Sequence, residues 1–114
     1  MLFLLSVLFA LPGVARGHAF PDHSDPKVGV TVSGSPASVR IWFDGDLEPV
    51  FSTISVQDAG GRKVDKGNGR VDPSNSTLLE VSLPPLPAGS YRVFWSVAAR
   101  DGHRTVGDYK FVIK

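Results

Sequence analysis

The sequence predicts an all-β protein, built as an antiparallel sandwich or barrel. Several short segments alternate apolar and polar side chains with the two-residue period of a half-buried strand. Turn-forming Gly, Pro, Asp and Asn residues separate these segments, and no segment after residue 17 has a 3.6-residue apolar period. The chain has no cysteine, so packing rather than disulfide bonds has to stabilise the fold.

The first 17 residues are expected to be a secretory signal peptide. Residues 1–14 are nearly all apolar, and Ala15-Arg16-Gly17 follows as a small-x-small cleavage site. The apolar run is shorter than the roughly 20 residues of a membrane span. No Lys or Arg precedes it, so an uncleaved anchor and a start further upstream are alternatives. Cleavage after Gly17 would make His18 the first residue of a single domain, 18–114.

The domain is expected to begin with an extended arm and to continue as strands. The arm, 18–26, is polar and contains two prolines. The expected strands share apolar alternation, and they are 38–43, 51–58, 77–83, 91–99 and 106–114.

The connections between these strands are rich in turn residues. Residues 43–49 (FDGDLEP) are expected to form a turn, and the glycine-rich stretch 59–76 is expected to contain one short strand near Val64. Residues 84–90 form a tight connection. The last two strands are joined by 100–105, whose Asp-Gly step is a good hairpin signal.

The charge balance gives no indication of nucleic-acid binding. The full chain has a formal charge of +1, and loss of Arg16 with the leader leaves equal numbers of acidic and basic residues. Proteins that bind nucleic acid usually carry a basic patch. The single methionine is Met1, so the mature chain contains no sulfur and offers no ligand that Cu(I) prefers.

The three histidines are the best candidates for chemistry, because none lies in an expected core strand. His18 and His23 lie in the arm, and His103 lies in the Asp-Gly turn. A single histidine of this kind is usually an ordinary surface residue. Asp101 and His103 are two residues apart, so both side chains can point to the same side of extended chain. A plain hairpin turn remains the alternative for this pair.

Cleavage would give His18 two metal-binding nitrogens, a free α-amine and its ring Nδ1. Together they can form a six-membered chelate, and both lose their protons near neutral pH when a metal binds strongly. Further ligands from Asp101 and His103 would complete a set of nitrogens and one carboxylate. Such a set suits Cu(II) when it lies in a plane.

Three stretches of the sequence resemble the CopC-type periplasmic copper-binding proteins. The opening HAFPDHSDP resembles the start of mature family members, which begin His-Ala and reach Ser-x-Pro a few residues later. VRIWFDGDLEP resembles the second strand of the family and the acidic turn after it. LPAGSYRVFWSVAARDGHRTVGDYKFVIK resembles the closing hairpin with its Asp-Gly-His turn.

The resemblance implies a Greek-key β-sandwich or barrel with an immunoglobulin-like or cupredoxin-like topology. It also implies a Cu(II) site formed by His18, Asp101 and His103, in an exported, periplasmic monomer. The implied function is a copper carrier or buffer in copper homeostasis or resistance. Its partner would be a CopD-like inner-membrane protein.

The sequence departs from the family pattern at two points. Phe20 stands where many members have a second histidine, and the methionine-rich Cu(I) site of some members is absent. The sequence therefore predicts a protein that binds Cu(II) alone. His23 stands where serine is usual; it is either an additional ligand or a solvated residue.

Two other motifs and two other functions are weaker alternatives. The spaced carboxylates of 44–48 suggest calcium but lack a full calcium loop, and 75–77 fits a glycosylation sequon. A copper-dependent oxidative enzyme can also use an N-terminal histidine chelate, but such enzymes normally combine it with neutral ligands and an open position for oxygen. A metal-free structural sandwich domain is the third possibility.

Overall fold

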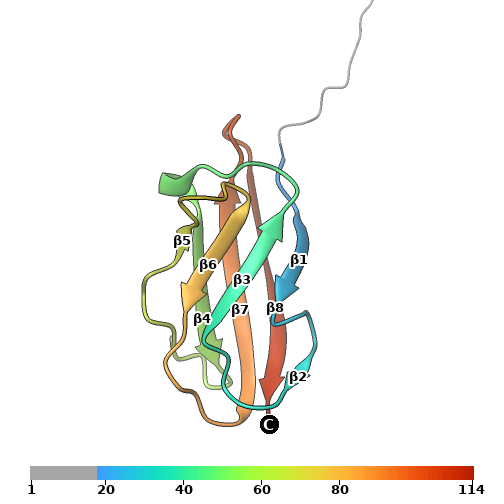
Figure 1. Ribbon diagram of the computed structural model, residues 1–114, viewed down its shortest axis with the longest axis vertical. Helices are drawn as coiled ribbons and strands as arrows, with labels where there is room; N and C mark the ends of the chain where they lie inside the picture. The colour runs from blue at the N-terminus through green and yellow to red at the C-terminus, as the bar shows by residue number, and fades with distance from the viewer. Residues whose placement is uncertain (1–17) are drawn as a thin grey trace, which may run out of the picture.

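A computed structural model describes residues 18–114, which form two four-stranded β-sheets packed face to face (Figure 1). The strands are β1 (Pro21–Asp25), β2 (Thr31–Val32), β3 (Ser38–Phe43), β4 (Thr53–Asp58), β5 (Arg70–Val71), β6 (Leu78–Ser82), β7 (Gly89–Ala98) and β8 (Arg104–Ile113). The one helical element is a 3₁₀ turn, η1 (Pro49–Phe51), so none of the helices in this part of the chain is long enough to cross a membrane. The predicted all-β sandwich is confirmed.

The two sheets have the strand orders β1-β3-β6-β5 and β2-β8-β7-β4. All but one of the strand pairs are antiparallel, and β7 pairs with β8 over the full length of both strands, from Gly89 opposite Ile113 to Ala98 opposite Arg104. This long hairpin connects the two ends of the sandwich. Figure 1 shows its turn at the end where the described chain begins, with the C-terminus at the opposite end.

The expected strands are found, with three differences. The arm forms an edge strand, β1, which pairs with β3. The two-residue strand β2 was not predicted, and it pairs in parallel with the end of β8. In the glycine-rich stretch the short strand is β5, not a strand near Val64. There the chain makes only an isolated bridge between Gln57 and Lys63 and a hydrogen bond from Val64 to Val56. Alternation cannot distinguish such short pairings from loops, because a two-residue strand has no period.

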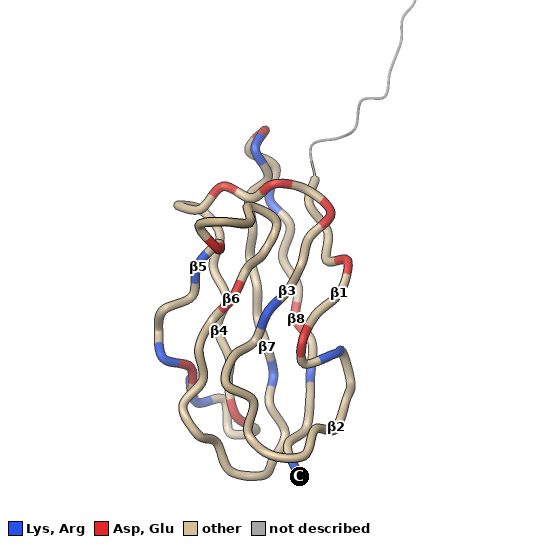
Figure 2. Tube along the Cα trace, in the orientation of Figure 1, with Lys and Arg blue, Asp and Glu red and all other residues tan. Residues whose placement is uncertain are grey.

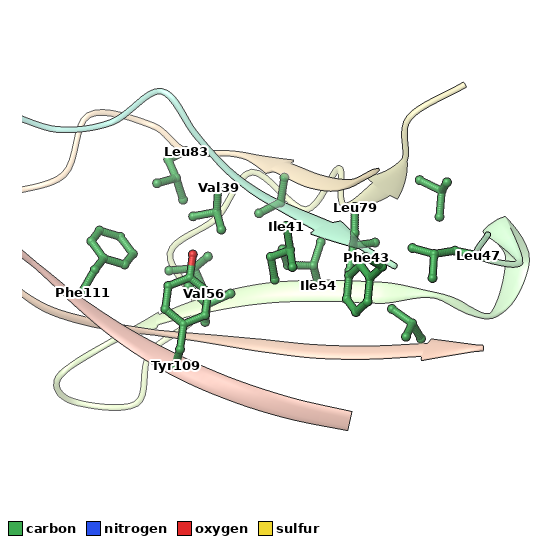
Figure 3. Close-up of a cluster of buried hydrophobic side chains, with 14 of the residues drawn as sticks. Val39, Ile41, Phe43, Leu47, Ile54, Val56, Leu79, Leu83, Tyr109 and Phe111 are labelled. Carbon is green, nitrogen blue, oxygen red and sulfur yellow. The ribbon is translucent and has the colours of Figure 1, made fainter. Parts of the chain in front are cut away.

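The core lies between the sheets and is formed by the inward-facing residue of each alternating pair (Figure 3). Val39, Ile41 and Phe43 face inward from β3, and Tyr109 and Phe111 face inward from β8. The alternation that predicted the strands therefore also predicted these core positions. Burial at about 25 cal/mol per Å² of apolar surface is the main stabilising contribution in a domain without disulfides.

Gly107 is required by the packing of Trp95 on the neighbouring strand. The two residues are paired across β7 and β8, and a Cβ atom at Gly107 would lie 2.4 Å from Cζ2 of the indole. The ring also meets Phe43 edge-on, with the two ring centroids 5.3 Å apart. The glycine therefore makes room for an aromatic residue that closes the core.

Asp65 covers the exposed edge of β4. Its carboxylate accepts the backbone N–H groups of Val56 and Gly67, each at 2.8 Å, and lies 3.1 Å from Lys63 Nζ. The side chain is only 1% exposed. Burial tends to raise the pKa of Asp65, but the two backbone hydrogen bonds and Lys63 outweigh it and lower the pKa below 3.8. The charged form is thus stabilised in the folded state.

We expect Gly107→Ala to reduce the free energy of unfolding by about 1–3 kcal/mol, because the new methyl group overpacks against Trp95. Denaturant titration followed by tryptophan fluorescence measures this loss. Gly45→Ala is the matched control, since its Cβ would meet its nearest atom at 3.6 Å. Equal stability of both variants and the wild type would show that Trp95 does not depend on the glycine.

Asp65 should make folding stability depend on acid pH. Because its pKa is lower in the folded than in the unfolded chain, its contribution is complete above pH 3.8 and disappears as the pH falls through its folded value. Asp65→Ala should lower the free energy of unfolding at neutral pH by about 1–3 kcal/mol.

Denaturant titrations at pH 7 and at pH 2–3 test this assignment. The difference between Asp65→Ala and the wild type should shrink at the lower pH. The exposed residue Asp22 supplies a control, because Asp22→Ala should change stability by no more than about 0.5 kcal/mol. A pH-independent difference would contradict the role given to the carboxylate.

Candidate metal centre

The turn between β7 and β8 is a tight hairpin whose conformation requires a glycine at position 102. Gly102 N–H bonds to Ala99 C=O at 2.8 Å, and Ala99 N–H bonds to His103 C=O at 2.9 Å. Gly102 has a φ of +93°, a conformation that L side chains rarely adopt, so glycine is needed here. The turn thereby places Asp101 and His103 on either side of a residue with no side chain.

Asp101 and His103 are joined within this turn. Asp101 Oδ1 accepts the backbone N–H of His103 at 3.0 Å, and Oδ2 lies 2.7 Å from His103 Nδ1. When Nδ1 carries the proton and donates it to the carboxylate, Nε2 is left with a free lone pair. The backbone hydrogen bond, the ring hydrogen bond and the nearby histidine charges lower the pKa of Asp101. The carboxylate is therefore ionised at neutral pH.

The chain preceding β1 is fixed to both sheets. Ala19 is buried in the core with 1% exposure, and its C=O accepts the hydroxyl of Thr105, on β8, at 2.7 Å. The N–H of Phe20 donates to Asp44 Oδ1 at 2.8 Å, and the N–H of Asp44 donates to the C=O of Phe20 at 2.9 Å. These contacts could not be predicted from the sequence, because nothing in the sequence pattern pairs an acidic turn residue or a strand threonine with the arm.

These contacts bring His18 to the hairpin turn. The rings of His18 and His103 lie with their centroids 4.8 Å apart, at an angle of 41°. His18 is also close enough to Asp101 for its charge to lower the pKa of the carboxyl group. All three predicted site residues therefore lie together, although more than eighty residues of chain separate His18 from the other two. All three are exposed to solvent.

The side chains of the described residues do not by themselves form a metal site. Within residues 18–114 no group of three His, Asp or Glu side chains is arranged closely enough to hold a metal ion. One predicted donor, the α-amine of His18, exists only when the chain begins at that residue. The two neighbouring rings and the carboxylate are the part of the predicted site that folding alone assembles.

His23 contacts a different set of residues, on β1 and β3. Its ring stacks on Trp42 with the centroids 4.5 Å apart and the planes 8° apart, and its Nδ1 is 2.9 Å from Asp22 Oδ2. Its ring is thus engaged along β1 and β3. These contacts agree with the reading of His23 as a surface residue rather than an additional ligand.

The acidic residues after β3 lie at the end of the sandwich where the β7–β8 turn lies, but each has its own partner (Figure 2). Asp44 binds Phe20, Asp46 Oδ1 accepts the Ser76 hydroxyl at 2.5 Å, and Glu48 lies 3.7 Å from Arg100. In the described part of the chain these carboxylates do not converge on a common point. The geometry gives no support to a calcium site in 44–48.

Comparison with known proteins identifies the family. The model of the CopC domain matches residues 22–114, which is most of the chain. The chain belongs to the CopC family. Two relatives of this chain are the copper transport protein CutJ of Bacillus subtilis, 31% identical over 98% of this chain, and the copper resistance protein C of Escherichia coli, 27% identical over 90%. The chain covers 21% of the length of CutJ and 91% of the length of protein C.

Solved CopC-family structures have the same fold. CopC from Methylosinus trichosporium matches with a TM-score of 0.75 and 33% identity over 85% of this chain and 94% of its own. PcoC from Escherichia coli, described as a methionine-rich copper resistance protein, matches with a TM-score of 0.73 and 26% identity over 85% and 99%. The present chain differs from that description of PcoC, because its single methionine is Met1.

Proposed function

We propose that this CopC-family protein is a periplasmic Cu(II) carrier or buffer, with the ion held by His18, Asp101 and His103. The observation that carries the proposal is the 4.8 Å approach of the His18 and His103 rings. Two segments from opposite ends of the sequence are brought together by specific hydrogen bonds, and each supplies a residue type that binds copper. The names of the relatives, which describe copper transport and copper resistance, support the choice of metal.

The donor set favours Cu(II) among the copper states. A mature N-terminus at His18 would supply an amine and a ring nitrogen, and His103 would supply Nε2, because its Nδ1 faces Asp101. Imidazole and amine nitrogens suit Cu(II) in a planar arrangement, whereas Cu(I) prefers sulfur ligands. Residues 18–114 contain neither cysteine nor methionine.

Asp101 would act both on His103 and on the ion. A carboxylate has about four lone-pair sites, so Asp101 can keep its two bonds to His103 and still accept a metal bond. Its lowered pKa means that no proton competes with the metal at neutral pH. Its negative charge stabilises the doubly charged ion relative to the singly charged one.

A carrier agrees with this site better than an oxidative enzyme does. Oxygen chemistry requires reduction of the copper ion, and the Asp101 charge opposes that reduction. The site is also exposed at one end of the sandwich, with Asp101 and His103 side chains 43% and 61% exposed. Exposure allows an ion to be taken up from solution and passed to a second protein.

Export and transfer complete the proposal. Removal of residues 1–17 as a signal peptide would both send the protein to the periplasm and create the His18 amine. The partner would be a CopD-like inner-membrane protein that receives copper from a monomer of this domain. The alignment of this chain with one fifth of the copper transport protein CutJ supports a link to transport.

The test is a Cu(II) titration followed by electron paramagnetic resonance. Protein that begins at His18 should bind one equivalent tightly. A version whose His18 α-amine is acetylated should bind at least tenfold more weakly, because an acetylated amine has no free lone pair for the ion and the chelate is lost. His103→Ala should also weaken binding at least tenfold, as expected when one strong ligand, worth more than about 1.4 kcal/mol, is removed.

His23→Ala provides the matched control, since it removes a histidine from the same arm without touching the cluster. Its affinity should equal that of the wild type. Equal binding by the acetylated protein would contradict the chelate, and loss of binding in His23→Ala would move the site to β1.

A further inference from the structure

We propose that Thr105 and Asp44 are positioning residues that set the affinity of the copper site without touching the ion. This inference rests on the proposed function, because it concerns how His18 is presented to the metal. The Thr105 hydroxyl donates to the C=O of Ala19. The Asp44 carboxylate accepts the N–H of Phe20, and the backbone N–H of Asp44 donates to the C=O of Phe20. We call these three hydrogen bonds the arm clamp.

The arm clamp restrains the backbone of the two residues that follow His18, Ala19 and Phe20. A mature chain has no residue before His18, so only the contacts of the following residues can restrict where its ring and amine lie. Ala19 is buried, and the clamp bonds lie one and two residues beyond His18. Without them, the first residues would sample many conformations and lose that freedom only when the metal binds.

The clamp joins both sheets to the arm. Thr105 lies on β8, two residues after His103, while Asp44 directly follows β3 in the other sheet. Strand β8 therefore begins directly after the proposed ligand His103, and its Thr105 fixes the backbone next to the proposed ligand His18. The position of His18 relative to His103 then depends on this short segment of β8, whose pairing with β7 is continuous, and on Asp44 in the other sheet.

Two of the three clamp bonds depend on a side chain, the Thr105 hydroxyl or the Asp44 carboxylate, and the third is a backbone bond from Asp44 N–H to Phe20 C=O. The Thr105–Ala19 bond is 2.7 Å and the Asp44–Phe20 bonds are 2.8 and 2.9 Å, all within the usual range of protein hydrogen bonds. The acceptor of the Phe20 N–H is a carboxylate oxygen, and hydrogen bonds to charged groups are stronger than neutral ones. Loss of either side should therefore release the arm measurably.

The test compares Thr105→Val with Thr105→Ser in protein that begins at His18. Valine keeps the shape of threonine and removes the hydroxyl, whereas serine keeps the hydroxyl. Thr105→Val should bind Cu(II) about tenfold more weakly and release it faster, as expected for one lost hydrogen bond. Thr105→Ser should bind like the wild type. The electron paramagnetic resonance spectrum of the loaded protein should be unchanged in both, because the ligands remain the same.

Asp44 is tested in the same way, with a control for charge. Asp44→Ala should weaken Cu(II) binding about tenfold, and Asp44→Asn, which keeps an oxygen acceptor, should retain most of the affinity. Asp46→Asn removes a charge from the same loop, where the side chain bonds to Ser76 rather than to the arm. It should leave the affinity within about twofold of the wild type.

A metal-free measurement separates the clamp from the copper proposal. Amide hydrogen exchange of Phe20 should be faster in Asp44→Ala than in the wild type, with no copper present. Unchanged Cu(II) affinity in both Thr105→Val and Asp44→Ala would overturn the clamp while leaving the copper site in place. If the wild type itself fails to bind Cu(II), the proposed function is wrong, and the exchange of Phe20 alone then decides whether the clamp exists.

Discussion

The candidate site depends on the docking of the first residues of the domain against both sheets. Burial of Ala19 and the backbone hydrogen bonds of Ala19 and Phe20 fix the direction in which His18 leaves the sandwich. Without that constraint, the hairpin would hold one histidine and one carboxylate, too few ligands for tight copper binding. In the proposed function, the β-sandwich therefore contributes mainly by holding two segments, distant in sequence, at one end of the molecule.

The hairpin turn contributes a second, local constraint. Gly102 allows the turn, and Asp101 bonds to both the backbone and the ring of His103. The carboxylate therefore fixes which ring nitrogen is free and supplies negative charge. Residues that orient a histidine commonly affect metal affinity almost as strongly as the ligands do. In this turn, a residue proposed as a ligand also orients its neighbour.

Much of the fold, and the hairpin turn that carries two of the candidate site residues, could be predicted from the sequence, because both depend on local patterns. Alternation located the long strands and their buried residues, such as Ile41 and Phe111, and the Asp-Gly step located the hairpin. Residue types and spacing suggested Asp101 and His103 as candidate ligands. That His18 would lie close to them could be predicted only from the resemblance to a family. Spacing alone cannot show that an arm folds back across the molecule.

The features that sequence reasoning missed are those that depend on tertiary contacts. The pairing of β2 with β8 involves two residues and has no periodic signal. The hydroxyl of Thr105 and the carboxylate of Asp44 acquire a role only when the arm lies between them. Their residue types are ordinary on a β-sheet surface and in a turn, so no motif distinguishes them. The position of His23 likewise became clear only from its stacking on Trp42.

The most direct measurement is a crystal structure of the Cu(II)-loaded protein that begins at His18, with anomalous diffraction at the copper edge. The account predicts one copper ion bound by the amine and ring of His18 together with His103 and Asp101, at the hairpin end of the sandwich. A copper ion located at His23, or a His18 that points away from the turn while copper is bound elsewhere, would contradict it.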